Sequence, residues 1–160
     1  IIVLGYSMVK HLDENRLSNK HNVKVHFFRG STTVNMQDHA KQYIEGKPDI
    51  LGIHCGVNDF PNKINTFKQV KKLIKVVKEN NENTEIFVSG VIHRYDDEEY
   101  NDKIDALNEK LEKYCKNNNI YFVNNANINR KGISKDNIHL NYSGNGVLAR
   151  NFLDLFNSLD

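Results

Sequence analysis

The 160-residue chain contains 39% hydrophobic and 26% charged residues, values typical of a soluble globular protein with one full core, so we expect a single domain over residues 1–160. The net charge is only +2 and the lysines are distributed along the sequence, so this domain alone is not expected to bind nucleic acid. No apolar run approaches the about 18 residues of a transmembrane helix.

Two cysteines, Cys55 and Cys115, lie without metal-ligand spacing around them, which argues against a zinc site and against a disulfide framework. We therefore expect no metal and a reducing compartment, most simply the cytoplasm. The sequence shows no signal-like segment, and it starts within a predicted strand without an initiator methionine, so we expect it to be part of a longer protein. Its oligomeric state is not indicated.

The first predicted element is a buried strand, residues 1–4, which runs into Gly5 and then Ser7. This pattern is typical of a parallel strand that delivers a side chain to a cleft. After Ser7, residues 8–17 are expected to form a helix, because their apolar side chains recur at helical intervals: Met8, Val9, Leu12 and Leu17.

Further strands and helices alternate along the rest of the chain. Apolar runs predict strands at residues 23–28, 49–54, 85–89 and 120–123. Helical spacing predicts helices after Thr32 or Thr33 up to residue 44, over residues 66–80 and 98–118, and through residues 147–156. Alternation with short loops implies right-handed crossovers, so we predict an α/β protein: a three-layer α/β/α, flavodoxin-like domain with a five-stranded parallel sheet.

Polar residues suited to acyl transfer occur where ligands bind in such folds, beyond the carboxyl ends of the strands. Serine chemistry needs a base, a carboxylate that orients the base, and donors for the oxyanion. Ser7 is the candidate nucleophile, His139 the candidate base, and Asp136 its partner three residues earlier. The backbone N–H groups of Ser7 and Gly30 and the side chain of Asn58 are candidate oxyanion donors.

These residues fall in four blocks: Gly5-Tyr6-Ser7, Arg29-Gly30, Gly56-Val57-Asn58-Asp59 and Asp136-Asn137-Ile138-His139. Their order and spacing resemble the SGNH (GDSL-type) esterases and lipases. The resemblance implies a cofactor-free serine esterase in which Ser7, His139 and Asp136 form the triad and Ser7, Gly30 and Asn58 form the oxyanion hole. Its partner would be a small-molecule or lipid ester, and acetyl or other short acyl groups suit a chain with short loops.

Finer features are similar to one animal branch of this family, which includes esterase domains in first-open-reading-frame proteins of non-LTR retrotransposons. They are the segment Ser89-Gly90-Val91-Ile92-His93-Arg94, the apolar helix over residues 98–118, and Ile138-His139-Leu140-Asn141. His93 and Arg94 follow a strand and are expected to reach the substrate rim. The other histidines lack a carboxylate or cysteine at ligand spacing and are interpreted as surface or packed residues: His11, His21, His26, His39 and His54.

One departure from the family pattern is Tyr6, which stands where the family usually has aspartate before the nucleophile. This exchange supports an alternative, a catalytically silent binding module that retains the pocket. A flavodoxin-like nucleotide binder also fits the predicted fold, but the turn after the first strand lacks a glycine-rich phosphate loop. Asp59 is interpreted as a structural brace for the Asn58 loop.

Overall fold

A five-stranded sheet with the order β2-β1-β3-β4-β5 forms the centre of the computed structural model, which describes residues 1–159. Every neighbouring pair of strands is parallel. The strands are β1 (Ile2–Gly5), β2 (Lys24–Phe27), β3 (Ile50–His54), β4 (Glu85–Ser89) and β5 (Tyr121–Val123). The helices are α1 (Thr33–Glu45), α2 (Thr66–Asn80), α3 (Glu99–Asn117) and α4 (Tyr142–Ser158). The predicted α/β fold with a parallel sheet is confirmed.

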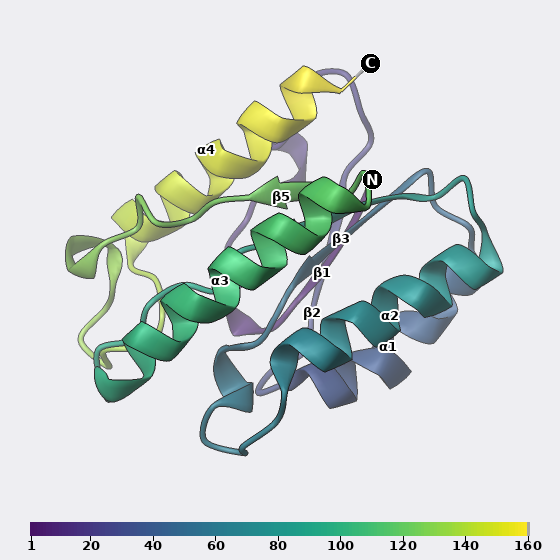
Figure 1. Ribbon diagram of the computed structural model, residues 1–160. Helices are drawn as coiled ribbons and strands as arrows, with labels where there is room; N and C mark the ends of the chain where they lie inside the picture. The colour runs from purple at the N-terminus through teal and green to yellow at the C-terminus, as the bar shows by residue number, and fades with distance from the viewer. Residues whose placement is uncertain (160) are drawn as a thin grey trace.

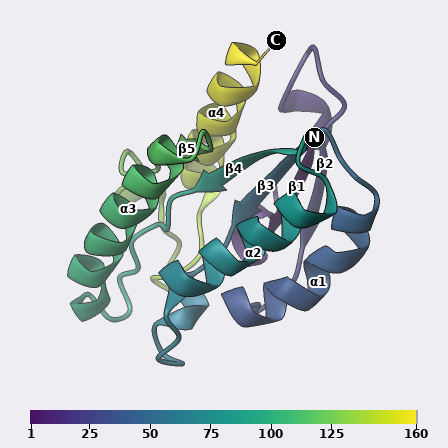
Figure 2. The same ribbon diagram turned by 45° about the vertical axis from the view of Figure 1, so that its right-hand side comes forward.

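Helices cover both faces of the sheet. Figures 1 and 2 show α1, α2 and α3 next to one another on one face, and α4 on the other. The order along the sheet explains this arrangement, because each right-handed crossover from β2 to β5 advances in one direction and places its helix on the same face. The connection from β1 to β2 advances in the opposite direction along the sheet, so it lies on the second face, together with α4.

Aromatic packing seats α4 on the sheet. The ring centroid of Phe87 in β4 lies 5.5 Å from that of Phe152 and 5.6 Å from that of Phe156, both in edge-on contacts. Its register partner in β3 is Gly52, where a Cβ atom would lie 2.0 Å from Phe87 Cζ. A side chain at Gly52 would therefore displace the ring that anchors the helix.

The predicted helix over residues 8–17 is wrong. The structure has two short 3-10 helices there, η1 (Ser7–Val9) and η2 (Glu14–Arg16). The carboxylate of Glu14 accepts a 2.7 Å hydrogen bond from the backbone N–H of Val25, so the segment is tied to the edge strand β2 instead of closing helical turns. Its apolar side chains are nevertheless buried, which explains the misleading periodicity: Met8, Val9, Leu12 and Leu17.

The structure also bears on membrane spans, disulfides and metal sites. Within residues 1–159 no helix is long and apolar enough to cross a bilayer. Cys55 and Cys115 are both free and buried. The described part of the chain also holds no group of three or more His, Cys, Asp or Glu side chains placed to bind a metal ion.

Candidate active site

Ser7 lies directly beyond the carboxyl end of β1, as the first residue of η1. The side chain is half-buried, and within residues 1–159 no hydrogen bond occupies its hydroxyl or its backbone N–H. The serine therefore presents a free hydroxyl and a free backbone donor at the edge of the sheet where parallel α/β folds bind ligands. A helix of only three residues supplies little dipole, so the local field does not come from an extended helix N-terminus.

Gly30 belongs to a tight turn beyond β2 that is fixed to the end of β1. The N–H of Phe28 donates to the carbonyl of Gly5 at 2.9 Å, and the N–H of Ser31 donates to the carbonyl of Phe28 at 3.1 Å. Gly30 has a φ of 67°, a conformation that favours glycine, and no atom would lie within 4 Å of an added Cβ. Backbone conformation therefore explains this glycine.

Asn58 lies in η3 (Val57–Asp59), beyond β3. Its side-chain Nδ2 donates to the carbonyl of Ser31 at 3.0 Å. This hydrogen bond joins the Asn58 loop to the turn that carries Gly30 and leaves the second amide hydrogen of Asn58 for another acceptor. The structure therefore places two of the three predicted oxyanion donors in neighbouring, directly linked loops.

Asp59 braces this loop, in agreement with the structural role expected for it. Its carboxylate is fully buried and accepts hydrogen bonds from the backbone N–H of Thr33 at 2.8 Å and from the hydroxyl of Thr66 at 2.7 Å. The Thr33 hydroxyl donates to it as well. Because Thr33 and Thr66 begin α1 and α2, one carboxylate fixes the Asn58 loop to the first turns of two helices.

Asp136 and His139 form a direct pair in the loop before α4. Asp136 Oδ2 lies 2.6 Å from His139 Nδ1, while its Oδ1 accepts 2.9 Å hydrogen bonds from the backbone N–H groups of Ile138 and His139 and from the Ser134 hydroxyl. Partial burial of the carboxyl opposes ionisation, but these hydrogen bonds outweigh it and hold the pKa of Asp136 well below its usual range. The imidazole therefore faces a permanent carboxylate, and its Nε2 is the nitrogen left for other chemistry.

Ser7 and His139 line one cavity of about 310 Å³. Its walls also include residues that were not predicted as site residues: Lys10, His11, Phe27, Arg29 and Asn145. Two of these adjoin predicted site positions, since Arg29 precedes Gly30 and Lys10 lies three residues beyond Ser7. That adjacency was the available signal, whereas His11 had been interpreted only as a surface or packed residue. The cavity is small and carries cationic side chains beside the candidate nucleophile and base.

Tyr6 does not cover Ser7. Its side chain is 3% exposed, and its ring stacks on that of His54 with centroids 5.4 Å apart and an interplanar angle of 9°. Burial raises the pKa of the Tyr6 hydroxyl far above its usual value, and that hydroxyl has no hydrogen-bond partner within residues 1–159. Tyr6 is therefore a core residue beneath the serine turn.

His93 and Arg94 are not among the residues that line the cavity at Ser7, and their expected position at the substrate rim stays a prediction. His93 Nε2 lies 2.6 Å from the carboxylate of Asp105. Arg94 is buried, binds both carboxylate oxygens of Asp96, and donates to the carbonyl of Val57 at 3.3 Å. Arg94 thus holds the backbone carbonyl of the residue before Asn58.

Comparison with known proteins identifies the family. Residues 10–147 match the family model described as GDSL-like Lipase/Acylhydrolase. The chain belongs to this family. No curated protein matches the chain in sequence.

Solved structures with the same fold are distant in sequence. A protein from Bacteroides fragilis NCTC 9343 provisionally described as an acylhydrolase is 16% identical, with a TM-score of 0.84 over 98% of this chain and 85% of that one. A member of the lipolytic G-D-S-L family from Veillonella parvula is 16% identical, with a TM-score of 0.82 over 99% and 98% of the two chains. Axe2, an acetyl-xylooligosaccharide esterase from Geobacillus stearothermophilus, is 14% identical, with a TM-score of 0.79 over 99% and 94%. Further matching structures are catalytic mutants of Axe2 in which a serine or a histidine is replaced by alanine.

Proposed function

We propose that this GDSL-like protein is a serine esterase that hydrolyses short-chain carboxylic esters through an acyl-enzyme intermediate. One observation carries the proposal: His139, whose Nδ1 lies 2.6 Å from the carboxylate of Asp136, lines the same small cavity as Ser7, whose hydroxyl is free. A nucleophile, a base and a carboxylate that orients the base are the parts that acyl transfer by serine requires.

In the proposed reaction Ser7 Oγ attacks the ester carbonyl carbon while His139 Nε2 accepts the hydroxyl proton. Asp136 holds the Nδ1 proton and stabilises the imidazolium that forms. The backbone N–H groups of Ser7 and Gly30 and the free amide hydrogen of Asn58 donate to the oxyanion. The tetrahedral intermediate then expels the alcohol, which leaves with the proton from His139. Water, activated by the same imidazole, attacks the acyl carbon and releases the carboxylic acid together with free Ser7.

The cavity supports short acyl groups. At about 310 Å³ it lies at the lower end of the range for small-molecule sites and is shared with charged side chains. The acetyl-xylooligosaccharide esterase among the matching structures agrees with such a substrate. The similarity to the retrotransposon-associated branch depends on sequence motifs alone and stays a prediction.

The alternative of a silent binding module is less well supported. It relied on Tyr6, which lies in the core and leaves the cavity open. The exchange of the usual aspartate for Tyr6 therefore does not block Ser7.

Hydrolysis of p-nitrophenyl acetate by the wild type and by Ser7→Ala tests the proposal. We expect Ser7→Ala to lose about a thousandfold or more in kcat/KM, because the nucleophile is removed. Ser158→Ala is the matched control: this serine lies at the exposed end of α4 and bonds only to its own helix at Leu155. Equal rates for the wild type and Ser7→Ala would refute the serine mechanism.

A further inference from the structure

The helix α2 gathers positive charge that the overall composition conceals. Its residues 66–80 include five lysines and one acidic residue, Glu79, whereas the whole chain has a net charge of only +2. The opposite face of α2 is apolar and buried in the core. The lysines therefore occupy the solvent side of the helix: Lys68, Lys71, Lys72, Lys75 and Lys78.

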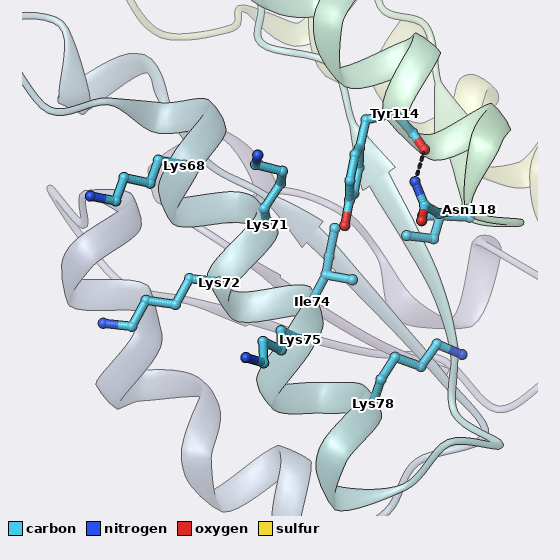
Figure 3. Close-up of a pocket in the computed structure, with 9 residues that line it drawn as sticks. Lys68, Lys71, Lys72, Ile74, Lys75, Lys78, Tyr114 and Asn118 are labelled. Carbon is cyan, nitrogen blue, oxygen red and sulfur yellow. Dashed lines mark hydrogen bonds between the residues drawn. The ribbon is translucent and has the colours of Figure 1, made fainter.

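A groove runs between this helix and α3. It has a volume of about 660 Å³, and Ile74 and Ile120 line it together with the lysines. Figure 3 shows Tyr114 of α3 and Asn118, which directly follows α3, on one side of α2, whereas Lys68 and Lys72 extend from the other side of this helix. We call this surface the lysine groove. It shares no lining residue with the cavity at Ser7.

Most of this charge is not neutralised by the protein. Within residues 1–159 Lys68, Lys71 and Lys72 make no ion pair, and Lys75 has a long, exposed contact of 3.7 Å with Glu79, a kind that contributes little. Lys71 Nζ lies 4.7 Å from the ring centroid of Phe67 and 6.0 Å from that of Tyr114. Lys78 is the exception, because it donates to backbone carbonyls, including that of Thr84 at 2.7 Å.

We propose that the lysine groove binds single-stranded nucleic acid through its phosphates. The ten residue steps from Lys68 to Lys78 span about 15 Å of helix, which matches roughly four phosphates on a strand that keeps the stacked spacing of about 3.4 Å per nucleotide. Tyr114 provides an aromatic ring within the groove, and bases stack on such rings without regard to sequence. The expectation of no nucleic-acid partner relied on net charge and on lysines dispersed in sequence, whereas the fold aligns five of them along one helix.

An anionic membrane fits this surface less well. Peripheral helices that bind bilayers insert apolar side chains between the headgroups. The exposed large hydrophobic residues within residues 1–159 are Phe27, Val34, Tyr121 and Tyr142, and none belongs to α2. The charged side of α2 thus offers electrostatic contact with a groove beside it, which suits a flexible polyanion.

Fluorescence anisotropy with a labelled oligouridylate of about twelve nucleotides tests the proposal, at salt concentrations between about 50 and 200 mM. The test variant is Lys68→Gln/Lys72→Gln/Lys75→Gln. The matched control is Lys20→Gln/Lys113→Gln/Lys116→Gln, which removes the same charge at exposed positions outside the groove. Circular dichroism and hydrolysis of p-nitrophenyl acetate report whether each variant remains folded.

For the wild type we expect log Kobs to fall with log salt with a slope of about −3, from roughly four phosphate contacts at about −0.7 each. The test variant should bind at least about tenfold more weakly at low salt, with a slope shallower by about 2. The control should keep the wild-type slope. Absence of wild-type binding at low salt, or equal losses in both variants, would overturn the proposal. So would binding only to phosphatidylserine-containing vesicles, which would assign the charge to membranes.

Discussion

The two carboxylate oxygens of Asp136 have different partners. Oδ2 lies 2.6 Å from His139 Nδ1, while Oδ1 accepts hydrogen bonds from two backbone N–H groups of its own loop and from the Ser134 hydroxyl. The same side chain therefore orders the loop and orients the imidazole. This dual role links the local fold before α4 to the chemistry proposed at Ser7.

Replacement of Asp136 by asparagine should separate these two roles. The amide oxygen still accepts hydrogen bonds, but it does not stabilise an imidazolium, so we expect kcat to fall on the order of a hundredfold to ten-thousandfold with a small change in KM. Steady-state hydrolysis of p-nitrophenyl acetate measures this. Ser134→Ala removes one partner of Asp136 and should cost less than about tenfold. A wild-type kcat in Asp136→Asn would contradict the pairing's role.

The depressed pKa of Asp136 also predicts a pH-dependent contribution to stability. A carboxyl with a lowered pKa in the fold stabilises it above the pKa of the unfolded chain, about 3.9, and loses this contribution as the pH falls toward the folded value. The difference in unfolding free energy between wild type and Asp136→Asn should thus be present near neutrality and shrink below about pH 4. Urea titrations at several pH values measure it, and a difference that grows in acid would contradict the assignment.

Asn58 should matter for the transition state. Loss of one oxyanion donor costs about a hundredfold to a thousandfold in kcat, so we expect this range for Asn58→Ala, with KM little changed. Because Asn58 also bonds to Ser31, the control is Asn62→Ala, which removes an amide that donates to the Asn58 carbonyl at 2.7 Å and only supports the loop. Similar kcat losses in both variants would indicate a purely structural role for Asn58.

Two substitutions of Tyr6 should have opposite effects on stability. Its hydroxyl is buried without a partner in the described residues, a situation that costs about 1–3 kcal/mol, so Tyr6→Phe should stabilise the protein by about 1 kcal/mol and preserve activity. Tyr6→Asp restores the residue usual in the family but places a carboxylate against His54, and it should destabilise the fold. Thermal melts and urea titrations measure both, and a destabilised Tyr6→Phe would show that the hydroxyl has a favourable contact.

His54 should make stability fall in mild acid. Burial lowers its pKa from 6.5 to about 4, so the fold favours the neutral ring. The contribution is fully present above pH 6.5 and is lost progressively down to about pH 4, by roughly 3 kcal/mol at most. Urea titrations of the wild type and of His54→Phe at about pH 7 and about pH 5 measure it. The unfolding free energy of His54→Phe should change much less between these two pH values than that of the wild type. An equal change in both proteins would assign the pH dependence to other groups.

The sequence predicted the elements whose side chains repeat regularly against a core. The strands and α1 to α4 carry apolar residues at strand or helix spacing, and α2 occupies the predicted residues 66–80. The helix predicted over residues 8–17 is wrong because Glu14 accepts a hydrogen bond from Val25 of β2, a contact distant in sequence. The spacing of apolar residues reflects which side chains are buried, and an irregular segment packed on a sheet can produce the same spacing as a helix.

In the candidate site, too, contacts that are local in sequence were predictable and contacts that depend on tertiary packing were not. The local pair Asp136 and His139 was predictable from a three-residue spacing, whereas the sequence did not reveal that Arg94 binds Asp96 and donates to the carbonyl of Val57. The five lysines of α2 lie within residues 68–78, and only the packing of α2 beside α3 brings Tyr114 next to them. Side-chain direction and contacts between helices depend on tertiary packing, which a single sequence does not display.

The central claim is that Ser7 is a nucleophile activated by His139. Reaction with a fluorophosphonate probe, followed by peptide mass spectrometry, tests it most directly because the probe bonds covalently only to an activated serine. We predict stoichiometric labelling of Ser7 in the wild type, little or none in His139→Ala, and unaltered labelling in Ser158→Ala. No labelling of the folded wild type, or labelling at another serine, would contradict the claim.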